Sequence, residues 1–334
     1  MEASAYLSCM GVDVTLLEKA DRLGGHLRNW EKLFPTLRMG SEVLNFLSQG
    51  ISSKITVKTG CEAISAAKVD GKFQVRTSAG EDLVADALLI ATGYETFDAR
   101  KKEEYGYGIY DNVMTSAELE SVFLSGKPLF THAGKVPGRV AFIHCVGSRD
   151  ARAGNDYCSK VCCVTAVKQS IEIRKRLPHC EAFCFYMDLR MYGTHFEELY
   201  NEALEKWGVS FIRGRLSEAA ENQDGSLLIK VEDTLAGRPL RMSVDVLVLM
   251  VGFVPSEGTT RIGKSLGLEF GPNKFIKPSD EHIMNNMSSM QGVFIAGTAS
   301  APRTITNTII DSRAAAATVL SYLNRFPIES RSIV

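Results

Sequence analysis

The chain alternates between short apolar runs and longer stretches with helical spacing, and this pattern predicts an α/β protein. Apolar or alternating runs predict strands at Val12–Glu18, Phe73–Ser78, Leu83–Ile90, Arg139–Val146, Ala182–Met187, Val209–Ile212 and Gly292–Ile295. The spacing of apolar residues predicts helices at Glu2–Met10, Val164–Leu177 and His195–Trp207. It also predicts a last helix of about 20 residues that ends near Arg325.

Two parts of the chain repeat the same order of features. Each opens with an Asp-Gly turn, at Asp70-Gly71 and again at Asp224-Gly225, and each ends in an apolar run, ALLIATG or VLVLMVG. A repeat of this length predicts two related nucleotide-binding-like halves. Chance similarity between two β-hairpins is the alternative interpretation.

The first strand leads into features of a dinucleotide-binding βαβ unit. It ends in Glu18-Lys19, and a glycine-rich turn with Gly24, Gly25 and His26 follows. An acidic residue at the end of the second strand of such a unit accepts hydrogen bonds from a ribose. The GxGxxG turn that belongs about 20 residues earlier would precede the first residue of the chain. We therefore expect the chain to begin inside the motif, as a fragment or a truncated reading frame would.

The composition is that of an ordinary globular protein, and 334 residues are enough for two domains. Hydrophobic residues make up 45% and charged residues 23%, and 38 basic residues balance 39 acidic ones. This balance gives no basic surface for nucleic acid and no polybasic membrane patch. No apolar run approaches the roughly 18–20 residues of a membrane span, and no secretion signal opens the chain. We expect a cytoplasmic protein that neither binds nucleic acid nor inserts into a membrane.

Four of the eight cysteines form the pattern C-x12-C-x3-C-C, at Cys145, Cys158, Cys162 and Cys163. Cys158 and Cys162 are one helical turn apart, so their thiolates are expected to point the same way. Clustered cysteines in a cytoplasmic protein indicate metal binding or catalysis rather than disulfides. Four soft thiolates suit an iron–sulfur cluster or zinc. Because zinc more often uses paired CxxC hooks, the spacing favours the cluster; zinc, and buried or redox-active thiols, are the alternatives.

Other residues near these cysteines carry weaker signals. Cys180 and Cys184 lie on one face of a strand, which indicates core thiols. His144 precedes Cys145 on a strand and points to its opposite face, which indicates a structural role. Lys168 lies on the helix after the cysteines, where spacing alone favours a solvated surface lysine. The alternative is an ammonium group that stabilises a reduced flavin. No set of residues indicates a hydrolytic site.

Several motifs together resemble the A subunit of heterodisulfide reductase, the flavoprotein of a thiol–disulfide electron-transfer complex. They are LLEKADRLGGHL (16–27), ATGYE (91–95), CVGSRD (145–150), YCSKVCC (157–163) and MDLRMYGTHFEELY (187–200). CVGSRD with YCSKVCC is specific, whereas GGHL and ATG indicate only the wider class of flavoproteins similar to thioredoxin reductase. The resemblance covers nearly the whole chain. It implies a thioredoxin-reductase-like α/β flavoprotein with two dinucleotide-binding-type domains, in which the first strand and GxGxxG of the FAD domain are missing.

The resemblance also implies FAD and one [4Fe–4S] cluster and assigns residues to each. The cluster ligands would be Cys145, Cys158, Cys162 and Cys163, and Lys168 matches a lysine beside flavin N5. The FAD residues would be Glu18 at the adenosine ribose with Lys19 beside it, Gly24, Gly25 and His26 on the flavin side, Thr92 and Gly93 near the dinucleotide, Gly297 by the pyrophosphate or ribityl chain, and Thr304, Ile305 and Thr306 toward the flavin ring. Gly297-Thr298-Ala299 lacks the aspartate that holds a flavin ribityl hydroxyl in thioredoxin-reductase-like proteins.

The implied organisation is an FAD-binding domain in two parts, 1–115 and 256–334, around an inserted domain, 116–255, that carries the cluster. The protein would transfer electrons in thiol/disulfide or sulfur metabolism, together with B- and C-type subunits and with a homodimer as a further possibility. The additional ferredoxin-type cysteine motifs of the long members of the family are absent from this sequence. In this the chain looks closer to the A-type subunit of the heterodisulfide-reductase-like complex of sulfur oxidisers.

Two other functions are weighed against this one. An NAD(P)H-dependent flavin disulfide reductase would need a glycine-rich phosphate loop after Val146 and a redox CxxC, and the sequence has neither. A non-catalytic scaffold subunit or an inactive fragment would account for the missing first strand. A GxGxxG encoded upstream of Met1 would favour the flavoprotein over the scaffold.

Overall fold

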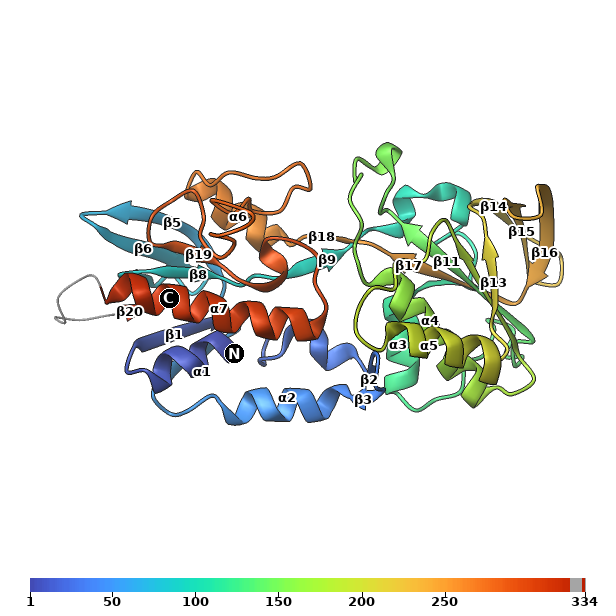
Figure 1. The fold of residues 1–334 in the computed structure, drawn as a ribbon, viewed down its shortest axis with the longest axis horizontal. Helices are drawn as coiled ribbons and strands as arrows, with labels where there is room; N and C mark the ends of the chain where they lie inside the picture. The colour runs from blue at the N-terminus through green and yellow to red at the C-terminus, as the bar shows by residue number, and fades with distance from the viewer. Residues whose placement is uncertain (325–331, 334) are drawn as a thin grey trace. The chain divides into compact units, whose positions relative to one another are not determined.

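The computed structural model describes residues 1–324 and 332–333 and folds the chain into two compact units (Figure 1). Unit 1 consists of Met1–Arg28, Ser41–Glu95 and Val254–Val334, and unit 2 consists of Asn29–Gly40 and Thr96–Phe253. The strands β9 (Tyr94–Thr96) and β18 (Phe253–Pro255) lie where the chain passes between the units after residue 95 and after residue 253.

The units differ in two places from the domains expected at 1–115, 116–255 and 256–334. Unit 2 begins at Thr96, because β10 (Val113–Thr115) pairs with β17 (Val246–Val251) in the sheet of unit 2 itself. The segment Asn29–Gly40 also belongs to unit 2, although it lies early in the chain. The assignment of FAD to one unit and of the cluster to the other remains a prediction.

Unit 1 combines parallel strands, an antiparallel sheet and helices (Figure 1). Its parallel strands pair as β20-β1-β4 and as β19-β8, namely β1 (Asp13–Glu18), β4 (Ile55–Thr59), β8 (Leu88–Ile90), β19 (Val293–Ile295) and β20 (Ser332–Ile333). Its antiparallel sheet has β5 (Ala63–Val69), β6 (Lys72–Thr77) and β7 (Asp82–Ala85). Its α-helices are α1 (Glu2–Cys9), α2 (Gly40–Gln49), α6 (Glu257–Ser265) and α7 (Ile305–Leu323).

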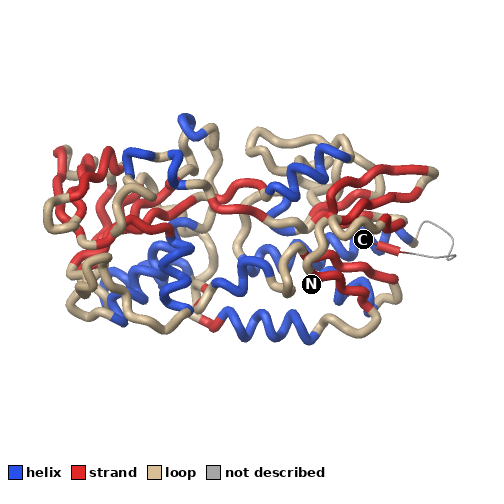
Figure 2. The backbone as a smooth tube through the Cα atoms, turned by 180° about the vertical axis from the view of Figure 1, so that it is seen from behind, coloured by secondary structure: helices blue, strands red, loops and turns tan. Residues whose placement is uncertain are grey.

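Unit 2 is built on a five-stranded parallel sheet in the order β10-β17-β11-β12-β13. The further strands are β11 (Arg139–Val146), β12 (Glu181–Tyr186) and β13 (Ser210–Arg213). Both β11 and β17 are apolar runs buried along nearly their whole length, as expected of strands covered on both faces. The helices are α3 (Ser116–Leu124), α4 (Cys162–Arg176) and α5 (Phe196–Asn201), and α3 and α4 pack on one side of the sheet (Figure 2). Unit 2 also contains a short hairpin of β2 (Lys32–Leu33) and β3 (Arg38–Met39). It further contains an antiparallel sheet of β14 (Leu216–Glu221), β15 (Leu227–Asp233) and β16 (Arg238–Val244).

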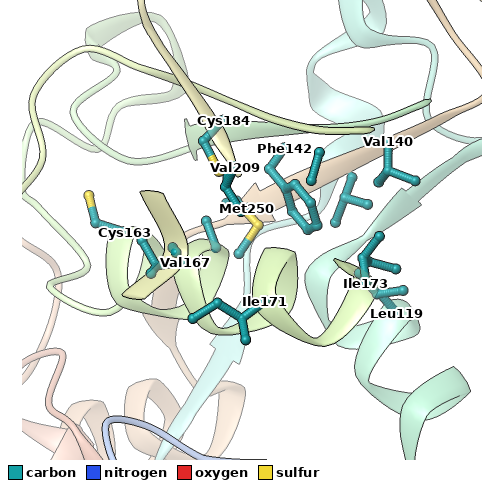
Figure 3. Packing of buried hydrophobic residues seen from close by; sticks show 14 of the residues in the cluster. Leu119, Val140, Phe142, Cys163, Val167, Ile171, Ile173, Cys184, Val209 and Met250 are labelled. Atoms are coloured by element: carbon teal, nitrogen blue, oxygen red, sulfur yellow. The ribbon is translucent and has the colours of Figure 1, made fainter. Parts of the chain in front are cut away.

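The core of unit 2 forms between α4 and the parallel strands. Figure 3 shows Cys163, Val167 and Ile171 on successive turns of α4, in the same buried cluster as residues of β11 and β12 such as Phe142 and Cys184. The apolar residues of one face of a helix meet a buried sheet here, and the first of them is a cysteine. The cysteine motif is therefore continuous with the packed core.

The internal repeat is present in the structure. Each copy is a three-stranded antiparallel sheet, β5-β6-β7 or β14-β15-β16, followed directly by a parallel strand, β8 or β17. The expected single strand Leu83–Ile90 is instead two strands in different sheets, because the chain turns at Asp86, whose carboxylate pairs with Lys72 at 3.2 Å.

The other predicted elements are found with small shifts at their ends. The helix expected at 195–207 is α5 followed by a π-helical stretch, Glu202–Lys206. The last helix ends at Leu323, and Arg325 lies outside the described residues. None of the helices in the described part of the chain is both long and apolar enough to cross a membrane.

Candidate functional site

In unit 1, the residues predicted to bind FAD follow the carboxyl ends of parallel strands. Glu18 ends β1, and Thr92 and Gly93 come just after β8. Gly297 comes just after β19, which pairs with β8 in register, so that Ala296 N donates to Ile90 O at 3.0 Å. In α/β sheets, ligands bind at this edge, where loops from several strands meet.

The residues around Glu18 contact the ATGYE segment. Lys19 Nζ lies 3.8 Å from a carboxylate oxygen of Glu95. His26 Nε2 lies 3.0 Å from Tyr94 O, and the His26 and Tyr94 rings stack with their centroids 4.5 Å apart. Two segments that are about 70 residues apart in sequence are thus brought to one place. Glu18 itself accepts a hydrogen bond from Ala20 N at 2.9 Å, which fixes the turn after β1.

Two glycines of the predicted FAD set have conformations that favour glycine. Gly24 has φ +118°, and a Cβ there would lie 2.7 Å from Leu44 Cδ1. Gly297 has φ +63°, and a Cβ there would lie 2.9 Å from Thr308 Cγ2. At both positions the positive φ and a close neighbouring atom disfavour any residue with a side chain. Glycine therefore leaves only backbone atoms at these two turns. Such turns allow a ligand to approach the backbone closely.

Asp311, which belongs to none of the motifs recognised in the sequence, organises the turn at Gly297. Its carboxylate accepts from Gly297 N at 2.6 Å and from Asn286 Nδ2 at 3.1 Å. Arg303 contacts the same carboxylate at 3.4 Å and donates to Gly297 O at 3.1 Å. An aspartate of α7 therefore holds the backbone of this turn in place. Its signal in the sequence is weak, because it lies 14 residues further along the chain.

Most of the remaining residues predicted to bind FAD lie near the Gly297 turn, and one, Thr92, is hydrogen-bonded to another side chain of unit 1. Gly93 faces Thr298 Oγ1, 3.8 Å from where a Cβ would lie. Thr304 caps α7 by accepting from Asn307 N at 3.1 Å, and Ile305 and Thr306 open that helix. Thr92, in contrast, shares a hydrogen bond of 2.5 Å with Thr259 of α6. Its role toward a dinucleotide stays a prediction.

In unit 2, three of the four predicted cluster cysteines meet where β11 ends and α4 begins. Cys145 is the second-last residue of β11, and its Sγ lies 4.0 Å from Sγ of Cys162, the first residue of α4. Cys163 follows on α4 and donates to Asp188 O at 3.7 Å. Cys158 lies in the preceding loop and accepts from Lys160 N at 3.3 Å. All four thiols are free.

The expected helical relation between Cys158 and Cys162 is wrong. The helix begins only at Cys162, because Lys160 has φ +62°, a left-handed angle that interrupts a right-handed helix. Cys145 and Arg149 also have positive φ values, of 60° and 51°. Non-glycine residues in this region cost about 1–3 kcal/mol each and concentrate at functional sites. Three of them between the end of β11 and the start of α4 indicate that this segment is shaped for something other than stability.

A buried ionic network holds this loop. Asp150 is almost fully buried and lies 2.9 Å from Lys102 Nζ and 3.0 Å from Arg215 Nη2. Its carboxylate also accepts from Arg152 N at 3.1 Å, and its backbone pairs with Asn155. Burial opposes the ionised form most, but the hydrogen bond and charge of Lys102 together with the charge of Arg215 outweigh it and hold the pKa of Asp150 below its usual value.

The cysteine thiols and His144 form one electrostatically linked group. Hydrogen bonding with Cys162 lowers the pKa of Cys145 and the pKa of Cys163. In turn, the hydrogen bonds with Cys145 and Cys163 raise the pKa of Cys162. Burial lowers the pKa of His144, but the thiols of Cys163 and Cys184 outweigh burial and raise it to about 10. Within the described residues, however, neither imidazole nitrogen has a hydrogen-bond partner of normal geometry. The linkage is therefore one of charge, and the thiols and the imidazole titrate together.

The donor set fits a soft metal centre in chemistry. Four cysteines supply thiolates, and charge linkage and hydrogen bonding favour thiolate at two of them. Across residues 1–324 and 332–333, no three His, Cys, Asp or Glu side chains are already arranged as a metal site. A buried guanidinium nitrogen of Arg149 next to this loop lacks a hydrogen-bond partner among the same residues. Arg149 was not predicted as a site residue, although it lies inside the CVGSRD motif.

Lys168 is buried, so the expectation of a solvated surface lysine is wrong. Its Nζ lies 2.5 and 2.7 Å from the two carboxylate oxygens of Glu120 on α3, and Gln169 Nε2 donates to the same carboxylate at 3.0 Å. The rings of Trp30 and Phe123 each lie 5.5 Å from Nζ. Burial lowers the pKa of Lys168, and Glu120 opposes this shift. The role beside a flavin stays a prediction.

The segment Asn29–Gly40 is attached to the same buried charges. Glu31 N donates to the Glu120 carboxylate at 3.0 Å, and Lys32 Nζ lies 2.8 Å from the buried Glu172 carboxylate. Arg176 of α4 pairs with the Glu31 carboxylate in turn. These contacts explain why the segment packs with α3 and α4 in unit 2.

Replacing Gly252 with alanine is expected to destabilise unit 2 by about 1–3 kcal/mol, since it overpacks a closed site. A Cβ at Gly252 would overlap Ser148 Oγ and lie 2.9 Å from Ser159 Oγ. Those two hydroxyls bond each other, and Ser159 Oγ accepts from Phe253 N at 2.8 Å. Urea unfolding measures the effect. Gly138→Ala is the matched control, with its nearest neighbour at 3.4 Å, and a shift as large in the control would contradict the steric argument.

The geometry and the fold define a class of protein. The structure is similar to thioredoxin reductase of Lactococcus lactis, with a TM-score of 0.69 and 15% identity over 97% of this chain and 95% of that one. It is also similar to thioredoxin reductase of T. acidophilum, with a TM-score of 0.66 and 18% identity over 96% and 93% of the two chains. The fold is therefore that of the thioredoxin-reductase-like proteins, which confirms the predicted fold class.

Sequence comparison names the relatives more closely. The chain is 40% identical over 243 residues to the iron-sulfur A subunit of the CoB–CoM heterodisulfide reductase of Methanocaldococcus jannaschii, covering 71% of this chain. It is 37% identical over 258 residues, 76% of this chain, to the A subunit of the H(2):CoB-CoM heterodisulfide,ferredoxin reductase of Methanothermobacter thermautotrophicus. The chain is thus a relative of the heterodisulfide reductase A subunits, which confirms the resemblance of its motifs. It spans 37% and 39% of the length of these two proteins. No protein-family model matches the chain.

Proposed function

We propose that this chain is an FAD- and [4Fe–4S]-containing electron-transfer part of an A-type subunit of a heterodisulfide-reductase-like complex. It would act in thiol/disulfide or sulfur metabolism. The observation that carries the proposal is the meeting of Cys145, Cys162 and Cys163 where β11 ends and α4 begins. The printed names of relatives include an iron-sulfur subunit of a heterodisulfide reductase, which supports the choice of a cluster over zinc.

Unit 1 would hold FAD at the carboxyl ends of β1, β8 and β19. Glu18 and Lys19 lie where a ribose would be bound, and the bare backbone at Gly24 and Gly297 would admit the phosphates and the flavin. Arg303, near Gly297, offers a cation for phosphate. When bound, FAD couples two-electron to one-electron steps. The thioredoxin-reductase-like fold supports this placement only at the level of architecture.

Unit 2 would hold the cluster at the four cysteines. An iron–sulfur cluster carries single electrons, at a potential set by charge, hydrogen bonds and burial. The chain's own part is to keep three of the four thiols buried in the core and to hold the loop through Asp150. The expected partners are B- and C-type subunits, with homodimer formation as an alternative. A cytoplasmic location is also part of the proposal and agrees with eight free cysteines.

Anaerobic purification of the protein followed by cofactor analysis tests this function. We expect about one FAD per chain, together with about four iron and four sulfide, as a [4Fe–4S] cluster requires. The absorbance spectrum should show a broad visible shoulder that bleaches on reduction, with a paramagnetic signal appearing at the same time. Stoichiometric zinc with no broad visible absorbance would overturn the cluster. Iron and sulfide without flavin would overturn only the FAD part.

A further inference from the structure

A buried nitrogen of Arg149 lacks a partner inside unit 2. Arg149 Nη2 donates to Asp188 Oδ2 at 2.7 Å, whereas Nη1 is buried and has no hydrogen-bond partner within residues 1–324 and 332–333. A buried donor of a charged group that is left unpaired lowers the stability of the folded protein. Such an atom in a native structure calls for a partner, and here the polypeptide does not supply one.

The backbone places Arg149 between two of the predicted ligands. Arg149 follows Cys145 by four residues, on the loop that leaves β11. Its N–H donates to Tyr157 O at 2.9 Å, and Tyr157 immediately precedes Cys158. Its φ of 51° is the left-handed angle that brings the chain back on itself here. The residue is therefore fixed from both sides of the cysteine loop.

The side chain links Arg149 to a third ligand through Asp188. The Asp188 carboxylate accepts from Arg149, and its backbone carbonyl accepts from Cys163 Sγ at 3.7 Å. One residue thus contacts both the guanidinium and the start of α4. Arg213 also reaches this carboxylate, at 3.3 Å, from the more exposed side.

The electrostatics agree with this placement. The Asp188 hydrogen bond raises the pKa of Arg149 most, burial opposes it, and the thiols of Cys145 and Cys158 raise it further. A permanent positive charge thus lies within electrostatic reach of two predicted ligands.

We propose that Nη1 of Arg149 donates a hydrogen bond to the sulfur shell of the cluster and that its charge raises the cluster's reduction potential. The inference rests on the proposed function. A cluster gains one negative charge on reduction, so a nearby cation stabilises the reduced state more than the oxidised state. Arginine suits this role, because its planar guanidinium has several N–H donors and can donate to Asp188 and to a sulfur atom at the same time.

A redox titration of anaerobically purified Arg149→Gln, followed by the paramagnetic signal of the reduced cluster, tests the inference. At the wild-type midpoint we expect the ratio of reduced to oxidised cluster to fall about tenfold, equivalent to about 59 mV for one electron. Arg149→Lys keeps the charge without the fork and should shift less. Arg213→Gln is the matched control, since it removes the other arginine from Asp188, and a change below about threefold is expected there.

The outcomes separate the two proposals. Wild-type protein without iron and sulfide would overturn both. A cluster whose potential is unchanged in Arg149→Gln, or shifts as much in Arg213→Gln, would overturn only the role of Arg149. If Arg149→Gln takes up no cluster, Asp188→Asn decides, because it removes the ion pair but keeps the guanidinium. Its potential should rise, and an unchanged or lower value would show that Arg149 only anchors Asp188.

Discussion

Replacing Lys168 with methionine is expected to lower the free energy of unfolding of unit 2 by about 3–5 kcal/mol. Lys168 is 0% exposed and Glu120 is 1% exposed, so the substitution would leave a carboxylate buried without its cation. Gln169 Nε2 and Glu31 N still offer that carboxylate two hydrogen bonds, which do not replace a charge. The midpoint of urea unfolding, followed by tryptophan fluorescence, measures the effect. Both tryptophans, Trp30 and Trp207, lie in unit 2, so the signal reports on that unit.

Two controls separate the lost ion pair from the change in volume. The double variant Lys168→Met with Glu120→Leu removes both charges and should recover most of the stability, because an apolar pair replaces the ionic one. Lys230→Met breaks a half-exposed pair with Glu218 in the same unit and should cost at most about 1 kcal/mol. A Lys168→Met midpoint as close to wild type as that of Lys230→Met would show that Lys168 and Glu120 do not form the buried pair described here.

Much of the fold could be predicted from the chain, because its strands are strongly apolar and short. The strand predicted at Arg139–Val146 has the same bounds as β11, and the two repeated hairpins are both present. The break at Asp86 was missed because it depends on the strands that pair with each half, β6 with β7 and β19 with β8, rather than on the local pattern. The place of Asn29–Gly40 in unit 2 could not be predicted either. It depends on buried charges that are supplied about 90 to 140 residues later in the chain.

The candidate site was predictable where one residue type carries the chemistry. Four thiolates in a specific pattern indicate a metal centre without reference to the fold. The supporting groups could not be found in this way. Asp311 reaches Gly297, and Asp188 reaches Arg149, only through the tertiary structure. Lys168 was misjudged because helical position alone does not tell which face of α4 is covered, and α3 covers this one.

Replacing any one of Cys145, Cys158, Cys162 or Cys163 with alanine is expected to remove most of the iron and sulfide from the purified protein. Each substitution deletes one of the four thiolates that a [4Fe–4S] cluster needs as ligands. Iron content should fall from about four atoms per chain to fewer than about one, with loss of the broad visible absorbance. Metal analysis and the absorbance spectrum measure both.

Cys180→Ala is the matched control, because it removes a thiol that is just as deeply buried in the same core. Burial raises the pKa of Cys180 to about 11, so this thiol stays protonated, and its loss should leave the iron content unchanged. The exposed fraction separates Cys158 from the other three ligands, because it alone is half-buried. If Cys158→Ala keeps its iron while the other three lose it, the site has three protein ligands and an open position. If Cys180→Ala loses as much iron as Cys162→Ala, cluster loss reflects damage to the core, and the ligand assignment is wrong.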